Sequence, residues 1–147
     1  MTELKHLEAF VKESLRFLGF NELERVCTKN YFIPELNVTL PKGSVIQIPA
    51  SSLMHLEKHY PNPSKFDPEG HFDNRILNPN NFYGFGQGPR SCVGFRFAWT
   101  MLRATLVNVL FHFKIMPGPN NSKLDTNSQA FLTSQKLGAH VKLEPRN

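Results

Sequence analysis

The sequence contains little cysteine, no internal repeat and no low-complexity tract. Its two cysteines, Cys27 and Cys92, are too few for the disulfide framework that holds many small secreted domains together. They are also too few to build a structural zinc site from cysteine ligands. An apolar content of 40% and a charged content of 20% indicate instead a globular chain, neither fibrous nor disordered.

Long apolar runs are also absent. The longest one, residues 97–113, is interrupted by Arg103 and is shorter than the ~20 apolar residues that a membrane span needs. Residues 1–20 carry charged side chains throughout, so they predict neither a signal peptide nor a membrane anchor. The chain as given is therefore not expected to cross a membrane.

Positive charge is in excess but is not concentrated in any segment. The chain has 17 Lys and Arg against 12 Asp and Glu, a formal net charge of +5, and no run of basic residues. Nucleic-acid binding needs a clustered basic patch, so no nucleic-acid partner is expected. A scattered excess fits a solvated surface or docking to an acidic protein.

Phenylalanine and proline, by contrast, are abundant, with 13 Phe and 11 Pro. Apolar spacing predicts a helix over residues 3–18, ended by Gly19. Apolar strand signals over 33–40 and 44–48 predict a hairpin that turns at Pro41–Gly43.

The second half of the chain alternates between irregular and helical patterns. A short helix is predicted at residues 51–59. Repeated prolines and asparagines predict irregular structure over 60–91, and a loop of this length in a compact domain is usually functional. Residues 95–113 predict a helix that is apolar on nearly all sides and therefore buried. Weak strand signals end at Val141–Leu143.

The segment before the last helix carries the chemistry. It reads Phe-Gly-Gln-Gly-Pro-Arg-Ser-Cys-Val-Gly over residues 85–94. Cys92 stands just before a predicted helix start, where the helix dipole favours the thiolate, the form that binds metals. Arg90 carries a planar cation suited to a carboxylate. Glycines let the backbone approach a flat object closely. This combination describes haem with an axial cysteine.

The pattern Phe-x-x-Gly-x-Arg-x-Cys-x-Gly resembles the haem-ligand signature of the haem-thiolate monooxygenases, the cytochrome P-450 superfamily. The resemblance implies that Cys92 is the proximal ligand of the iron of haem b, iron protoporphyrin IX. It implies that Arg90 is a haem-propionate partner and that Phe85 is the aromatic side chain beside the sulfur. The other residues implied to contact the cofactor are Gly86, Gly88 and Gly94 in the ligand loop, and Ala98 on the helix beneath it.

Two further segments agree with this resemblance. Glu13 and Arg16 match the family's Glu-x-x-Arg pattern, in which the two side chains share one helix face. The family takes a third member of this buried group from a downstream segment, where His71 stands here in place of the usual arginine. Arg25 resembles the second basic residue that pairs with a propionate in animal microsomal members.

The resemblance covers essentially the whole chain, but only the C-terminal part of the family's longer chains. Residues 1–147 are therefore expected to form a partial cytochrome P-450 domain, mainly α with a small β-sheet, and no complete independent domain. The expected order is the Glu-x-x-Arg helix, a β-hairpin, a meander, the cysteine ligand loop, a buried helix and C-terminal strands. The isolated chain is expected to aggregate because the buried helix would lose its covering on one side.

The function implied by the resemblance is a monooxygenase that inserts one oxygen atom of O2 into a small hydrophobic organic substrate. Its electrons would come from NADPH through a flavoprotein reductase, with Arg96, Lys58 and Lys65 as candidate docking contacts. A full-length relative would lie on the cytosolic face of the endoplasmic reticulum, held by an N-terminal anchor that this chain lacks. Residues near Ile48–Ala50 and Ala130–Leu132 would reach the substrate.

Two alternatives stay open at this point. The chain could be a non-catalytic remnant or interaction fragment with weak haem binding or none. It could also be a metal-binding module that uses Cys92 with His55 or His59, which lie four positions apart as helix-borne ligands often do.

Overall fold

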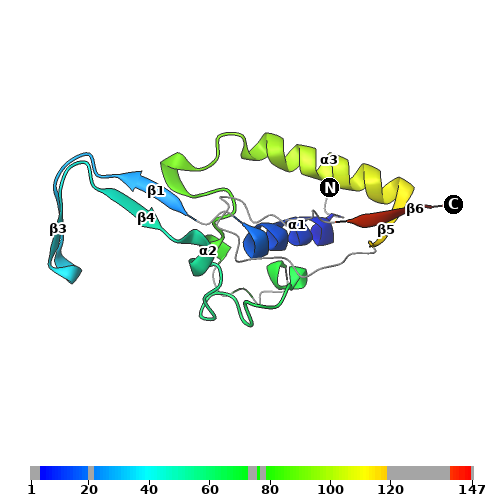
Figure 1. Ribbon diagram of the computed structural model, residues 1–147, viewed down its shortest axis with the longest axis horizontal. Helices are drawn as coiled ribbons and strands as arrows, with labels where there is room; N and C mark the ends of the chain where they lie inside the picture. The colour runs from blue at the N-terminus through cyan, green and yellow to red at the C-terminus, as the bar shows by residue number, and fades with distance from the viewer. Residues whose placement is uncertain (1–3, 20–21, 73–75, 77–78, 119–139, 147) are drawn as a thin grey trace.

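The computed structural model describes residues 4–19, 22–72, 76, 79–118 and 140–146 (Figure 1). The helices are α1 (Lys5–Leu18), α2 (Ala50–Leu53) and α3 (Phe95–His112). The strands are β1 (Leu23–Val26), β2 (Tyr31–Ile33), β3 (Val38–Leu40), β4 (Val45–Ile48), β5 (Phe113–Pro117) and β6 (Val141–Pro145). Short 3-10 helices are η1 (Pro34–Leu36), η2 (Pro68–His71), η3 (Pro79–Asn81) and η4 (Gly88–Arg90). Two long helices with small antiparallel sheets agree with the predicted mainly α class.

Helix α1 forms where its apolar spacing predicted it. Ala9 and Val11 are buried, and so are two charged residues of the same helix, Glu13 and Arg16. The helix ends at Gly19, as predicted, and the chain there becomes extended, with φ −71° and ψ 179°. A Cβ atom at this position would overlap the carbonyl oxygen of Leu15, so only glycine fits this exit from the helix.

The strands of residues 23–48 pair as two nested hairpins. β2 pairs with β3, and β1 pairs with β4 outside them, Leu23 opposite Ile48 and Val26 opposite Val45. The predicted hairpin between residues 33–40 and 44–48 is therefore wrong in its pairing, although strands do form in both segments. The turn at residues 41–43 exists, with Gly43 at φ +91°, but it joins β3 to β4 without pairing them. In Figure 1 these strands extend as an arm away from the helices.

The described residues of 60–91 are mostly irregular, as predicted. The short helix is smaller than the predicted 51–59, because α2 ends at Leu53 and turns follow it. Prolines begin two of the one-turn helices in this stretch, η2 and η3, and Pro89 is the second residue of η4. This path returns the chain to α1, against which η2 packs.

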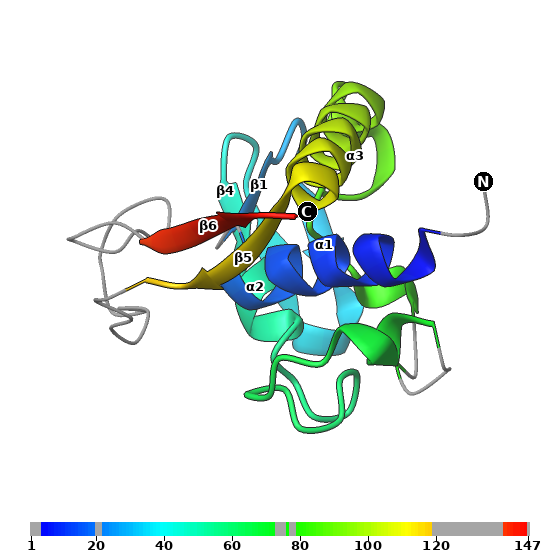
Figure 2. The same cartoon turned by 90° about the vertical axis from the view of Figure 1, so that its right-hand side faces the viewer.

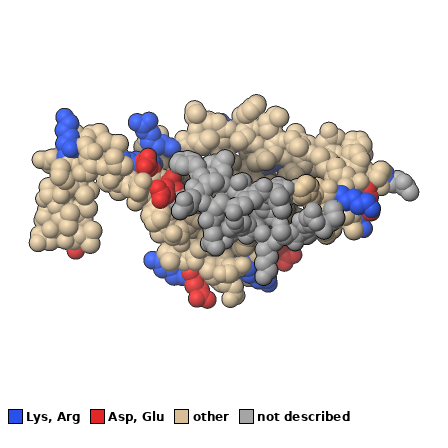
Figure 3. Space-filling view, in the orientation of Figure 1, with Lys and Arg blue, Asp and Glu red and all other residues tan. Residues whose placement is uncertain are grey.

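Helix α3 is present over nearly its predicted length, but the prediction that it is buried is wrong for this chain. None of its residues is buried, and Phe97 and Phe111 are 73% and 75% exposed. The helix crosses beside α1 in both views, and the Arg103 side chain on α3 donates a hydrogen bond to Glu8 on α1 (Figures 1 and 2). One side of α3 faces α1, and the other side is not covered by any of the described residues. In Figure 3 this edge of the molecule carries almost no charge.

The last sheet includes a strand that the sequence did not predict. β5 follows α3 directly and pairs antiparallel with β6, Ile115 opposite Leu143. Apolar residues continue from α3 into β5 on either side of His112 and Lys114, so hydrophobicity alone does not mark where the helix ends. The predicted strand at Val141–Leu143 is confirmed and extends to Pro145.

The buried core of the described residues lies between α1, α2 and the loop after α2. Met54 and Ala50 are 0% and 1% exposed, and Tyr60 is 3% exposed. Arg16 is among the most buried side chains of the same region. None of the helices in the described ranges has the length and apolar character that a bilayer crossing requires.

Candidate functional site

The cysteine loop, residues 85–94, is folded by its own backbone hydrogen bonds. The Cys92 N–H donates to the Phe85 carbonyl at 2.8 Å and closes the loop. Gly86 and Gly88 have φ of +70° and +71°, in the left-handed region that disfavours a side chain. The two positions with positive φ are therefore both occupied by glycine, the residue that adopts this conformation without strain.

Cys92 ends this loop immediately before α3. Its carbonyl accepts the N–H of Phe95, the first residue of the helix, at 3.3 Å. The residue is exposed and its thiol forms no disulfide. The loop and the helix thus present the sulfur on the surface, where an external partner has access to it.

Two arginines from different elements accompany the cysteine. Arg90 lies in η4 within the loop and is exposed. Arg25 comes from β1 and donates to the carbonyl oxygen of Gln87, in the same loop, at 3.3 Å. Leu23, also from β1, lies 3.7 Å from where a Cβ atom on Gly86 would stand. The structure therefore brings β1 against the cysteine loop across more than sixty residues of sequence.

Aromatic rings join the start of the loop to the helix after it. The Phe85 ring lies 6.4 Å from Phe95 and 6.0 Å from Trp99, the latter edge to face. Ala98 lies on the first turns of α3 and is half-buried. Trp99 was not among the predicted site residues. Phe95 and Trp99 are four positions apart and therefore share one face of α3, and the Phe85 ring contacts both of them.

The predicted group Glu13, Arg16 and His71 comes together behind the loop that follows α2. Arg16 donates Nε to Glu13 Oε2 at 2.8 Å and Nη2 to Oε1 at 2.9 Å, a bidentate pair. His71 Nε2 lies 2.9 Å from Glu13 Oε2. All three side chains are nearly inaccessible to solvent. His71 is thus the third member of the buried group, and it contacts Glu13 directly.

The electrostatics of this group favour an ionised Glu13. Burial acts to raise the pKa of its carboxyl group. Hydrogen bonds from His71 and Arg16 outweigh this effect and lower the pKa from 4.5 to about 2. The backbone N–H of Asp67 adds a fourth donor, at 2.8 Å. This hydrogen bond was not predicted from the sequence, because any residue type can donate a backbone N–H.

Arg16 also holds two backbone segments in place. Its Nη1 donates to the Met54 carbonyl at 3.1 Å, and its Nη2 donates to the Lys65 carbonyl at 3.2 Å. Both carbonyls belong to the irregular segment. One buried guanidinium therefore fixes the path of the loop between α2 and η2.

The metal-binding alternative gains no support from the described residues. His55 Nδ1 lies 2.8 Å from the Ser51 carbonyl, and His59 Nδ1 lies 2.8 Å from the Asn81 side-chain amide. Within the described ranges no three His, Cys, Asp or Glu side chains converge as metal ligands would. Both histidines are instead held by hydrogen bonds to their neighbours.

The residues predicted to dock a reductase or to reach the substrate do not form one site in the described structure. Arg96, Lys58 and Lys65 are all exposed, Arg96 beside the ring of Phe95. Of residues 48–50, Ala50 is buried in the core, so its side chain does not face outward. Residues 130–132 lie outside the described residues.

Comparison with known proteins assigns the family. The family model "Cytochrome P450" matches residues 1–142. The chain is 36% identical over 138 residues to cytochrome P450 3A2 of Rattus norvegicus, covering 91% of this chain and 27% of the relative. It is 36% identical over 146 residues to probable cytochrome P450 6a13 of Drosophila melanogaster, covering 97% and 30%. It is 40% identical over 116 residues to cytochrome P450 9e2 of Blattella germanica, covering 76% and 22%.

The chain belongs to the cytochrome P450 family, as the resemblance predicted. It spans less than a third of the length of these curated relatives. The donor set of the cysteine loop fits the cofactor that the family name implies. A surface cysteine, the guanidinium groups of exposed Arg90 and half-buried Arg25, and a glycine-bent backbone suit a metal, carboxylate arms and a flat ring respectively.

Proposed function

We propose that this chain is the C-terminal, haem-binding portion of a haem-thiolate monooxygenase. The observation that carries the proposal is the loop ending at Cys92, an exposed thiol held just before α3 by the hydrogen bond of its own N–H to Phe85. Family membership over residues 1–142 supports it. When bound, the haem iron supplies the activation of O2 that such enzymes use.

Residues of the cysteine loop, β1 and α3 would each hold a different part of the cofactor. Cys92 provides the sulfur ligand, and Arg90 and Arg25 provide cations for the two propionates. Gly86 and Gly88 bend the loop so that its backbone approaches the ring, and Gly94 leaves space before the helix. Phe85, whose ring packs on Trp99, would be the aromatic side chain beside the sulfur, and Ala98 lies on the helix that follows the loop.

The elements then correspond to parts of a larger enzyme. In this proposal α1 is the Glu-x-x-Arg helix, residues 60–84 are the meander, and α3 follows the ligand loop. Glu13, Arg16 and His71 hold the meander against α1. The complete enzyme would receive electrons from NADPH through a flavoprotein reductase and oxidise a small hydrophobic substrate at the endoplasmic reticulum membrane. Arg96, Lys58 and Lys65 are exposed and available for docking the reductase.

Reconstitution with haem tests the proposal. The chain is mixed with haem, reduced and exposed to carbon monoxide, and the Soret band of the thiolate-ligated adduct is recorded. Cys92→Ala should abolish this band, whereas Cys27→Ala, which removes a half-buried thiol in the arm, should leave it unchanged. A band that survives in Cys92→Ala would overturn the ligand assignment. A wild-type chain that gives no band would favour the non-catalytic remnant.

A further inference from the structure

Gln87, in the middle of the cysteine loop, contacts two other parts of the chain. Its side-chain amide donates hydrogen bonds to the carbonyl oxygen of Asn80, in η3, and to that of Phe82, the latter at 3.5 Å. Its own backbone carbonyl accepts a hydrogen bond from Arg25 Nη2, on β1, at 3.3 Å. The side chain and the backbone of one residue therefore link the segment before the loop, the loop itself and β1.

The residues on either side of Gln87 restrain its backbone little. Gly86 and Gly88 have φ of +70° and +71°, whereas Gln87 between them is extended, with φ −143° and ψ 160°. Glycine restricts its own φ and ψ less than any other residue, so two flanking glycines do not by themselves determine where the Gln87 carbonyl points. The hydrogen bonds of the Gln87 side chain to Asn80 and Phe82 add the missing restraint.

Arg25 takes its direction from that carbonyl. The residue is half-buried, and its terminal nitrogens donate to two backbone carbonyls, Nη1 to Glu24 at 2.7 Å and Nη2 to Gln87. Glu24 is the preceding residue of the same strand, so of these two contacts the one with Gln87 reaches the cysteine loop. A guanidinium that is held in place beforehand loses less side-chain entropy when it binds a carboxylate.

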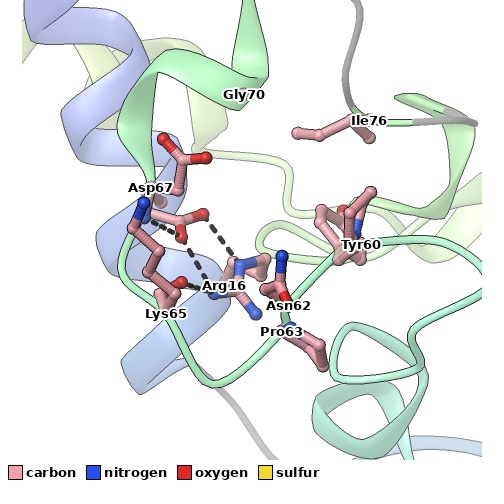
Figure 4. Close-up of a pocket in the computed structure, with 10 residues that line it drawn as sticks. Arg16, Tyr60, Asn62, Pro63, Lys65, Asp67, Gly70 and Ile76 are labelled. Atoms are coloured by element: carbon pink, nitrogen blue, oxygen red, sulfur yellow. Dashed lines mark hydrogen bonds and ion pairs between the residues drawn. The ribbon is translucent and has the colours of Figure 1, made fainter.

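The chain uses a similar arrangement in the buried group. There Arg16 donates to the backbone carbonyl of Lys65 and so fixes part of an irregular segment (Figure 4). In both places a polar side chain holds irregular backbone through its carbonyl groups. Gln87 differs from Arg16 in being exposed and uncharged, so its amide restrains the loop without competing with Arg25 for an anion.

We propose that Gln87 is a positioning residue for the cofactor, whose side-chain amide fixes the loop carbonyl that directs Arg25 towards a haem propionate. This inference rests on the proposed function, in which Arg25 is a propionate partner. Gln87 acts in this role through Arg25 and not on the sulfur ligand Cys92. Loss of its amide should therefore weaken cofactor binding without changing the iron ligand.

Gln87→Met tests this role, because methionine keeps the length of the side chain but has no N–H to donate. In a haem titration the affinity should fall about twofold to fivefold. The Soret band of the reduced carbon monoxide adduct should stay at the wild-type position, since Cys92 is unchanged. In the Arg25→Gln background, Gln87→Met should have no further effect, because the two residues act through one contact.

Gln47→Met is the matched control. Gln47 is also exposed, and its amide donates to the Glu24 side chain in the arm, so its loss should leave the haem affinity unchanged. Wild-type affinity in Gln87→Met would overturn the inference. A loss that persists in full in the Arg25→Gln background would overturn it too, because Gln87 would then act on the loop independently of Arg25.

Chemical modification supplies a second measurement that needs no haem. Phenylglyoxal reacts with accessible guanidinium groups, and peptide mass spectrometry gives the rate for each arginine. Arg25 should react about twofold faster or more in Gln87→Met than in the wild type. Arg16 is 2% exposed and should stay protected in both chains, which shows that the fold is intact.

The two measurements distinguish failure of the inference from failure of the proposed function. Equal Arg25 rates in Gln87→Met and the wild type, with Arg16 protected, would overturn the inference and leave the proposed function standing. A wild-type chain without the thiolate Soret band would overturn the proposed function, and with it the role of Gln87 in cofactor binding, even if the Arg25 rates differed.

Discussion

Glu13 and His71 lie 2.9 Å apart, Oε2 to Nε2, although 58 residues separate them in the sequence. This contact joins α1 to η2, and Arg16 completes it from the next turn of α1. The group is buried and every polar atom of the Glu13 carboxylate has a donor. It is therefore the point at which the irregular segment is tied to the helices.

Glu13→Gln should destabilise the chain by about 3–5 kcal/mol, because it leaves the buried guanidinium of Arg16 without its counter-charge. Chemical denaturation measures the change. Glu8→Gln on the same helix is the control, since the Glu8–Arg103 pair is one-third exposed and its loss should cost at most about 1 kcal/mol. Equal losses in the two variants would contradict the buried role of Glu13.

Stability should fall in acid through the same carboxylate. Because the folded chain holds the Glu13 pKa at about 2, below 4.5, ionised Glu13 stabilises the fold fully above pH 4.5. This contribution, roughly 2–3 kcal/mol, is lost as the pH falls from 4.5 towards 2. Denaturation midpoints across this range measure it for the wild type and for Glu13→Gln. The difference between the two should shrink as the pH falls, and a constant difference would refute the assignment.

Gly88→Ala should destabilise the cysteine loop by about 1–2 kcal/mol, since alanine is strained at φ +71°. Gly94→Ala provides the comparison, because Gly94 has φ −90° and equal free space around it. Its cost should be clearly smaller. Thermal unfolding and haem titration of both variants measure the two effects, and a Gly94→Ala loss as large as that of Gly88→Ala would show that backbone strain is not the cause.

Arg25→Gln should weaken haem binding about threefold to tenfold under the proposed function, through loss of a charged hydrogen-bond donor to a propionate. The residue stands against the cysteine loop through Gln87. Lys29→Gln removes one positive charge from the same arm and should leave the affinity unchanged. Spectroscopic titration gives the dissociation constants, and equal weakening by both changes would point to general charge attraction.

The exposed face of α3 should make the isolated chain aggregate. Replacing Phe97 and Phe111 together by lysine should lower light scattering and the binding of a hydrophobic dye, because both rings are mostly exposed. Thr100→Lys adds charge to the same helix without removing an apolar side chain and should help less. A wild-type chain that stays monodisperse without cofactor would refute this prediction.

Local signals predicted the elements that depend on neighbours in sequence. The apolar stripe of residues 3–18 and Gly19 defined α1, and the glycines of residues 85–94 marked the cysteine loop. The contact of Glu13 with His71 was predicted from the family pattern, because a separation of 58 residues leaves no local signal.

Strand pairing and burial could not be predicted in the same way. Residues 38–40 have strand character whichever partner they take, so the pattern did not distinguish β2 from β4. The boundary between α3 and β5 falls inside one apolar run. The apolar surface of α3 indicated burial, but burial depends on what covers the helix, which its own residues do not encode.

The nested order of the arm has a consequence for how the chain folds. Ile33 and Val38 are close in sequence, so β2 and β3 meet at small entropic cost. Once they have met, the ends of the arm are already drawn together, and β1 reaches β4 through a much shorter effective loop. We therefore expect the arm to pair from its tip towards its base. In this order the contact of Arg25 with the cysteine loop is expected to form after the outer pairs of the arm, although the tip of the arm does not itself touch that loop.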